Sequence, residues 1–169
     1  MLEIFRKRRS VREYLPKEVE QEKLDEVLKA AMFSPTAHNR RSWEFVVVKD
    51  KGIIEKLSKA TKWSDFAKGA PAVVILCADE SLDPRWIEDL SIAAGYIYLE
   101  AVNQGLGTCW IAVRDPQGSG NEENYVREII SVPEKIRILC MMPLGYPVEK
   151  KEEHMDSEFE LNKIHQEKW

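Results

Sequence analysis

Arginine and lysine side chains are concentrated in one short segment near the amino terminus. Five of the seven residues 6–12 are basic, although Asp and Glu outnumber Lys and Arg in the whole chain by 29 to 25. An arginine guanidinium binds a phosphate through two parallel hydrogen bonds, and the hydroxyl of Ser10 can supply a further donor. Taken alone, the segment indicates either a phosphate site or a solvated basic surface.

Two further segments could contact a planar ligand. Residues 34–43 form a polar loop in which Asn39 offers both a donor and an acceptor, with Thr36 close by in the sequence. In residues 105–110 (GLGTCW), a strand that follows two glycines could present backbone N–H groups. Each segment also has an ordinary structural interpretation. The loop could simply cap a helix, and the glycines could simply end one.

Signatures of the commonest enzyme classes are missing from the sequence. It contains no GxGxxG or Walker phosphate loop, no nucleophile elbow and no HExxH zinc motif. The histidines are scattered, and each cysteine lies in an apolar, strand-like run outside any CxxC pair. We therefore expect no metal site, no disulfide and no catalytic nucleophile, and we interpret the cysteines as small buried side chains. The residues concerned are His38, His154, His165, Cys77, Cys109 and Cys140.

The elements that must position these residues alternate along the chain. Apolar periodicity and β-branched runs predict helices over 2–9, 19–32, 53–61, 86–104 and 125–131, and strands over 43–48, 72–78, 108–113 and 136–142. This alternation favours helices packed on one mixed sheet. The helix over 86–104 is apolar around most of its circumference, so we expect it in the core or against another subunit. The charged residues 148–169 cannot form a core alone, and we expect them to lie across a surface such as a partner subunit's.

Length and composition fit a single globular domain spanning residues 1–169. The net charge of −4 argues against a nucleic-acid partner, because such binding relies on broad basic patches. The longest apolar run, residues 70–78, is too short to span a membrane. The first residues lack the apolar region of a signal peptide, so we expect a cytoplasmic protein.

Taken together and in this order, the segments resemble the FMN-dependent nitroreductase family. The resemblance covers nearly the whole chain and is carried by RRSVR at 8–12, PTAHN at 35–39 followed by Trp43, GLGTCW at 105–110, PLGYP at 143–147 and KIHQEKW at 163–169. The family implies an α+β fold, with a mixed, mostly antiparallel sheet flanked by helices. It also implies an intertwined homodimer that binds two FMN molecules at the subunit interface.

The resemblance further implies which residues contact FMN. The phosphate and the ribityl or pyrimidine end would be bound by Arg8, Arg9, Ser10 and Arg12. The isoalloxazine ring would be lined, from the other subunit, by Pro35, Thr36, Ala37 and Asn39. Its other side would face the backbone of Trp110, Ile111, Ala112 and Val113. Within that backbone, the N–H of Ala112 would be the partner of flavin N5.

The implied activity is that of an FMN-dependent NAD(P)H oxidoreductase. NADH or NADPH would pass hydride to flavin N5, and a nitroaromatic, quinone or similar electron-poor small molecule would then be reduced in a ping-pong cycle. The flavin carries this chemistry, so no side chain need be catalytic. Two alternatives stay open: a flavin-binding carrier or redox sensor of the same fold, and a relative that acts on another substrate.

The sequence departs from the family pattern at two places. Arg41 and Ser42 stand before Trp43, where the family commonly has Gln-Pro. Many members also carry a basic residue beyond the GYP turn that reaches the flavin phosphate. Here Lys150 and Lys151 are the nearest candidates, and acidic residues follow them.

Overall fold

The computed structural model describes residues 1–114 and 120–169. Its helices are α1 (Glu3–Lys7), α2 (Gln21–Met32), α3 (Lys51–Leu57), α4 (Trp86–Asn103) and α5 (Asn121–Ile130). Its strands are β1 (Trp43–Val48), β2 (Ala72–Asp79), β3 (Gly107–Thr108), β4 (Ile111–Ala112) and β5 (Ile136–Gly145). Short 3-10 turns are η1 (Ala37–Asn39), η2 (Asp65–Gly69), η3 (Asp156–Glu158) and η4 (Leu161–Lys163).

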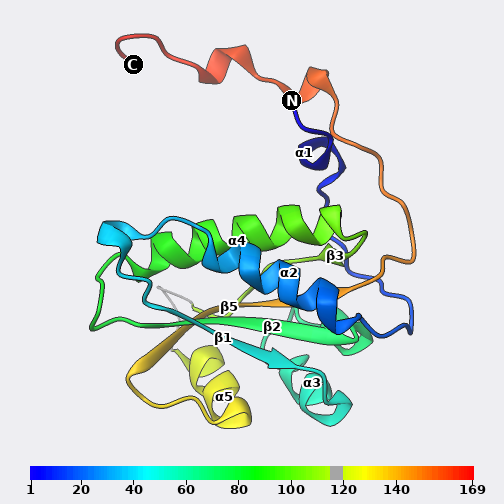
Figure 1. Ribbon diagram of the computed structural model, residues 1–169, viewed down its shortest axis with the longest axis vertical. Coiled ribbons are helices and arrows are strands. Elements are labelled where there is room, and N and C mark those ends of the chain that lie inside the picture. Colours follow the sequence, from blue (N-terminus) through cyan, green and yellow to red (C-terminus); the bar gives the residue numbers. More distant parts are fainter. Residues whose placement is uncertain (115–119) are drawn as a thin grey trace.

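The strands form one sheet in the order β1-β2-β5-β3, and β4 pairs with β5 beside β3. The pairings between these described strands are antiparallel, and a single parallel bridge joins Ser10 to Thr108. Helices α2 and α4 cover one face of the sheet, and α3 and α5 cover the other (Figure 1). This arrangement confirms the expected α+β fold with a mostly antiparallel sheet.

Alternation along β2 divides the core between the two faces. Val74, Leu76 and Ala78 pack in the cluster that includes α2 and α4, whereas Val73 and Ile75 pack with α3 and α5. Successive strand residues point to opposite faces, so a strand that is apolar throughout must be covered on both sides. All eight residues of β2 are buried. The continuous apolar run in the sequence therefore has a direct structural cause.

Helix α4 buries most of its surface against the sheet and α2, as its apolar composition predicts. Two of its large side chains nevertheless remain in solvent: Ile92 is 41% exposed and Tyr96 is 39% exposed. A helix that is apolar on both its inner and outer faces is typical of one that also meets another subunit.

The strand predicted over 108–113 is wrong as a continuous element. The register places Cys109 opposite Pro143, because Thr108 pairs with Leu144 and Ile111 with Met141. Proline has no N–H to donate to a neighbouring strand, so the ladder is interrupted there. The backbone N–H of Trp110 instead donates to the hydroxyl of Tyr98. The result is two short strands, β3 and β4.

Three predicted boundaries also differ from the structure. The helix predicted over 53–61 is α3, which begins at Lys51 because Asp50 accepts a hydrogen bond from the Ile53 N–H at 2.8 Å, and it ends at Leu57. Helix α5 begins at Asn121, four residues earlier than expected, because its first turn is polar and gives no apolar periodicity. Strand β5 continues to Gly145, beyond the predicted end at residue 142.

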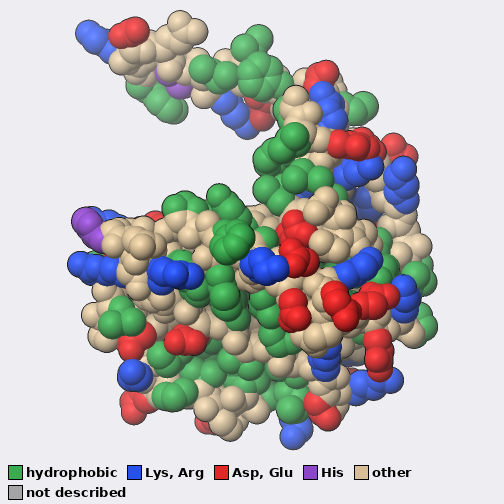
Figure 2. All heavy atoms as spheres, viewed as in Figure 1, with side chains coloured by type: hydrophobic (Ala, Val, Ile, Leu, Met, Phe, Trp, Pro, Cys, Tyr) green, Lys and Arg blue, Asp and Glu red, His purple; other side chains and the backbone are tan. Residues whose placement is uncertain are grey.

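The carboxy-terminal segment from residue 148 leaves the body of the molecule and passes beside α1 (Figure 1). The His154 N–H donates to the Arg6 carbonyl at 2.9 Å, and Arg6 also forms an ion pair with Asp156. Beyond these contacts the chain exposes several apolar side chains, some of which stand apart from the main body in Figure 2. They are Met155, Phe159, Leu161, Ile164 and Trp169. None of the described helices is long and apolar enough to cross a membrane.

Candidate functional site

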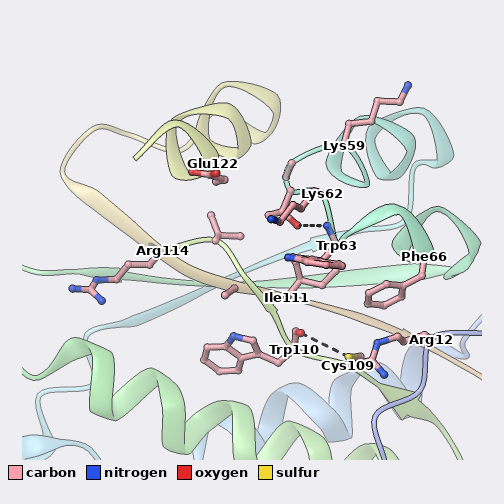
Figure 3. Close-up of a pocket in the computed structure, with 14 residues that line it drawn as sticks. Arg12, Lys59, Lys62, Trp63, Phe66, Cys109, Trp110, Ile111, Arg114 and Glu122 are labelled. Carbon is pink, nitrogen blue, oxygen red and sulfur yellow. Dashed lines mark hydrogen bonds between the residues drawn. The ribbon is translucent and has the colours of Figure 1, made fainter. Parts of the chain in front are cut away.

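A cavity of about 910 Å³ lies between the β4 segment and the link from α3 to η2 (Figure 3). Four separate parts of the described chain contribute to it: the segment after α1, the stretch from the end of α3 into η2, the residues in and around β4, and the start of α5. Its lining residues are Arg12, Lys59, Ala60, Thr61, Lys62, Trp63, Phe66, Cys109, Trp110, Ile111, Ala112, Val113, Arg114 and Glu122.

The segment that carries Arg12 is fixed by its backbone. The Val11 N–H donates to the Thr108 carbonyl at 3.0 Å, and the buried Tyr14 hydroxyl donates to the Val11 carbonyl at 2.7 Å. Gly107 allows this close approach, because a Cβ there would lie 2.5 Å from the Val11 Cγ2 atom. The Arg12 guanidinium then lies 5.8 Å from the centre of the Phe66 ring, which favours a cation–π contact. A positive charge is thus held at one end of the cavity.

The wall formed by β4 is supported from behind. The Trp110 N–H donates to the Tyr98 hydroxyl at 2.6 Å, and the Val113 and Arg114 N–H groups both reach the Leu139 carbonyl at 3.1 Å. Burial raises the pKa of Tyr98, so this hydroxyl stays neutral at physiological pH. Of the described strands only β5 pairs with β4, and the free edge of β4 borders the cavity.

The opposite wall is a tight turn organised by a buried serine. The Ser64 hydroxyl lies 2.9 Å from the Ser58 carbonyl and 2.8 Å from the Thr61 carbonyl, and it accepts the Thr61 N–H at 2.9 Å. Ser64 is fully buried, whereas its neighbour Trp63 is 75% exposed. The Trp63 ring lies over the cavity above Ile111 (Figure 3). The turn therefore presents an indole to the cavity from a fixed backbone.

The structure separates the predicted phosphate-binding residues. Arg12 lines the cavity, whereas Arg8 does not border it: the Arg8 guanidinium lies 5.5 Å from the Tyr98 ring centre and 3.1 Å from His154 Nε2. Ser10 is held by a backbone bridge to Thr108. Arg9 points elsewhere: it donates to the Glu152 carbonyl and lines a second cavity of about 300 Å³. Lys150 and Lys151, the candidate phosphate residues after the GYP turn, line that second cavity too.

The predicted ring-lining loop lies away from the cavity in the same chain. None of Pro35, Thr36, Ala37 and Asn39 borders the cavity. The Ala37 N–H donates to Asp89 near the start of α4, at 3.0 Å, whereas the cavity wall is supported by Tyr98. Asp89 and Tyr98 are nine positions apart in α4, which is about 14 Å along the helix axis. One chain alone therefore does not bring the loop and the cavity together.

Comparison with known proteins identifies the family of this chain. The family model described as the nitroreductase family matches residues 5–76 and 55–146. The chain belongs to the nitroreductase family. An FMN-dependent nitroreductase from Clostridium difficile R20291 has a solved structure that this nitroreductase-family chain matches with a TM-score of 0.95 and 41% identity, over 100% of both chains.

Two curated relatives extend the comparison. A protein of Methanothermobacter thermautotrophicus, provisionally named NADH dehydrogenase/NAD(P)H nitroreductase, is 36% identical to this nitroreductase-family chain over 100% of it and 87% of the relative. An FMN reductase [NAD(P)H] of Bacillus subtilis is 27% identical, over 84% of this chain and 64% of the relative.

Sequence reasoning missed several residues of this nitroreductase-family site. Lys59, Lys62 and Trp63 lie in the α3–η2 link and Phe66 lies in η2, and neither segment carries a motif. In the sequence, Tyr98 is one more apolar residue of a long helix. The one signal that the sequence offered was a tryptophan placed between polar residues. Its meaning depends on the cavity, which only the tertiary structure shows.

The cysteines of this nitroreductase-family chain are buried and unpaired, as expected. Burial raises the pKa of Cys77 to about 12 and that of Cys140 well above its ordinary value, so these two thiols stay protonated and unreactive. Cys109 borders the cavity but is only 2% exposed. Among the described residues, no group of three or more potential ligands could hold a metal ion.

Proposed function

We propose that the chain is an FMN-dependent NAD(P)H oxidoreductase that reduces nitroaromatic, quinone or similar electron-poor acceptors. The observation that carries this proposal is the cavity between β4 and the α3–η2 link in a nitroreductase-family chain. Its walls are a flat strand edge and aromatic rings, and its one end holds Arg12. The names of the relatives, which include FMN reductases and nitroreductases, support the same conclusion.

The residues of the cavity fit a flavin ring. The ring is planar, with an apolar dimethylbenzene end and a pyrimidine end that carries hydrogen-bond acceptors. Trp110, Ile111 and Phe66 supply apolar surface, the free edge of β4 supplies the Ala112 backbone N–H, and Arg12 supplies a cationic donor. Bound FMN would supply the hydride chemistry, moving two electrons from NAD(P)H to the acceptor, with the further proton drawn from water.

The chain's own residues would bind and orient the cofactor. We assign Arg12 to the pyrimidine end, and Arg8 with Ser10 to the ribityl phosphate. Arg8 lies against Tyr98, which supports the cavity wall, and Ser10 is bridged to Thr108, the neighbour of the lining residue Cys109. The Ala112 N–H is assigned to flavin N5. We assign Arg9 a smaller part in phosphate binding, because its side chain lines the second cavity. A fixed positive charge at Arg12 would also favour electron transfer into the ring.

A second copy of the chain would complete the site. The loop 35–39 lies about 14 Å along α4 from Tyr98, the residue that supports the cavity wall. This loop would therefore line the cavity of a partner chain. Ile92 and Tyr96 on α4 are exposed where a partner could cover them, and the segment from residue 148 exposes apolar side chains that would pack on that partner. Light scattering of the full chain tests this directly. A monomer mass in a sample that holds FMN would contradict it.

The deciding experiment is the visible spectrum of the purified protein, with FMN added, followed by NADH and NADPH without oxygen. A flavin spectrum that bleaches is the expected result. Bound flavin that neither nucleotide bleaches would favour the carrier or redox sensor. Steady-state turnover with a quinone, compared with free FMN, separates an enzyme from a flavin store. A protein that binds no flavin would overturn the proposal.

A further inference from the structure

The α3–η2 link brings an aromatic ring and a cation together at the cavity. Trp63 exposes most of its indole, and the Lys62 ammonium lies 5.1 Å from the centre of that ring. Both residues line the cavity, and Figure 3 shows them on the wall opposite Trp110 and β4. A planar molecule placed in this cavity would therefore meet an indole face with a positive charge beside it.

Hydrogen bonds hold the backbone that carries Lys62 and Trp63. The buried Ser64 hydroxyl ties the turn to Ser58 and Thr61, and the Trp63 N–H reaches the Thr61 hydroxyl at 3.1 Å. A binding surface with a fixed backbone loses less conformational entropy when a ligand binds. The turn is thus suited to recognition and is not an arbitrary surface loop.

Lys62 differs from its neighbouring lysines in its pairing. Lys59 is paired with Glu55 at 3.3 Å, and Lys68 is paired with Asp65 at 2.8 Å. Across residues 1–114 and 120–169, no ion pair joins Lys62 to a carboxylate. Its charge is therefore available to a ligand, and the indole beside it removes part of its water.

The other charges of the lining do not cancel this one. Glu122 lies on α5 across the cavity, and Arg114 lies on that same side (Figure 3). Arg12 adds a second positive charge at the Phe66 end of the cavity. Among the described lining residues, Arg12, Lys59, Lys62 and Arg114 are basic and Glu122 is the one carboxylate, so the described lining is positive on balance.

We infer that Lys62 and Trp63 form an acceptor-binding subsite that selects planar aromatic acceptors carrying a negative charge, such as nitrobenzoates. The inference rests on the proposed function and names the acceptor class for the same site. Trp63 stacks on the acceptor ring, and Lys62 pairs with its carboxylate. Added salt weakens the attraction within such a partly desolvated ion pair, so the salt dependence of acceptor preference tests the assignment.

The test compares 4-nitrobenzoate with 4-nitrobenzamide, which have nearly the same shape but different charge. A neutral N-benzyl dihydronicotinamide serves as hydride donor, so no donor phosphate contributes. The ratio of kcat/KM for the two acceptors is measured in the FMN-loaded wild type and in Lys62→Gln. Intrinsic differences in reduction potential cancel when the ratios are compared. We expect the ratio to fall roughly three- to tenfold in the variant, as for a partly exposed ion pair.

Lys68→Gln is the matched control, because Lys68 is a paired lysine of the same region that does not line the cavity. Its acceptor ratio should equal that of the wild type. Added salt should lower the wild-type ratio and leave the Lys62→Gln ratio nearly unchanged. An unchanged ratio in Lys62→Gln overturns the inference. An effect that appears only with NADH as donor also overturns it, because Lys62 would then serve the donor's phosphates.

Binding without turnover gives an independent readout. Both nitroaromatics quench indole fluorescence, and the part of the signal due to Trp63 is isolated with Trp63→Phe. Tighter binding of 4-nitrobenzoate than of 4-nitrobenzamide, lost in Lys62→Gln, supports the subsite even in a protein that proves to be a carrier. Equal binding of the two compounds overturns the subsite, while a spectrum that NADH bleaches would leave the proposed function intact.

Discussion

The hydroxyl of Tyr98 accepts the backbone N–H of Trp110 at 2.6 Å, and so joins the long helix α4 to the wall of the cavity. Arg8 lies over the ring of the same tyrosine, with its guanidinium 5.5 Å from the ring centre. One side chain thus connects the amino-terminal basic segment with the strand that borders the cavity. We regard Tyr98 as a positioning residue, since it does not itself line the cavity.

Replacing Tyr98 with phenylalanine should weaken both folding and FMN binding. The change keeps the ring but leaves the Trp110 N–H without its acceptor, which should lower the free energy of unfolding by about 1 kcal/mol. Urea unfolding measures the first effect, and titration of the apoprotein with FMN measures the second. Tyr125→Phe is the control, because its hydroxyl donates to the Lys56 carbonyl at an exposed place. Equal FMN affinity in the two variants would contradict the positioning role.

Gly107→Ala should displace the segment that carries Arg12. The new Cβ would lie 2.5 Å from Val11 Cγ2 and 2.7 Å from Val11 Cβ, so the backbone must move. We expect a loss of about 2 kcal/mol in stability, as for overpacked sites, and weaker FMN binding. Gly69→Ala is the matched control, since a Cβ at Gly69 meets nothing within 4 Å. Thermal unfolding and flavin content are measured on both variants. Equal values for the two variants would contradict the predicted displacement.

The two arginines at positions 9 and 12 should differ in their effect on FMN. Arg12 lines the large cavity, whereas Arg9 lines the smaller one and donates to the Glu152 carbonyl. Arg12→Ala should therefore raise the FMN dissociation constant at least tenfold, as expected when a charged hydrogen bond is lost. Arg9→Ala should raise it less. A larger effect at Arg9 would show that the cofactor phosphate reaches the smaller cavity.

Glu123 should make stability depend on acid pH. Burial raises the pKa of this carboxyl, but hydrogen bonds from Arg137 and the Ile138 N–H outweigh burial, so the pKa lies below its ordinary value of 4.5. The carboxylate therefore stabilises the fold above pH 4.5, and this contribution is lost as the pH falls through the lowered pKa. Glu123→Gln should cost about 2 kcal/mol at pH 7, because it removes the charged hydrogen-bond partner of the half-buried Arg127 and Arg137.

The difference between wild type and Glu123→Gln should then shrink below pH 4.5, where the wild-type carboxyl takes up its proton. Urea unfolding at several pH values follows this change. Glu128→Gln on the same helix serves as control, because Glu128 is exposed. A wild-type advantage that stays constant down to pH 3 would be inconsistent with the lowered pKa.

Local pattern was sufficient to predict most of the fold. The apolar run at residues 72–78 and the periodicity of α2 each require burial in one particular way, and the structure follows them. The break between β3 and β4 could not be predicted from local pattern. Pro143 stops the ladder only because the register sets it opposite Cys109, and register is a property of strands far apart in the sequence.

The candidate site was predictable in part. Arg12 and residues 110–113, which the resemblance assigns to FMN contacts, line one cavity. The direction of the Arg9 side chain depends on the backbone of the segment 8–12, where alternate residues face opposite ways. The wall made by Lys62 and Trp63 depends on the turn around Ser64, whose hydrogen bonds join residues that show no common pattern.

The separation of the loop 35–39 from the cavity has a genetic consequence. If each site draws one half from each chain, then Arg12→Ala and Asn39→Ala damage different halves. In a mixed dimer of the two variant chains, both lesions fall on one site and the other site is intact. Random assortment of equal amounts makes about half of the dimers mixed, so about one quarter of the sites should recover. Two inactive alleles expressed together would then complement each other, which two lesions within a single-chain site cannot do.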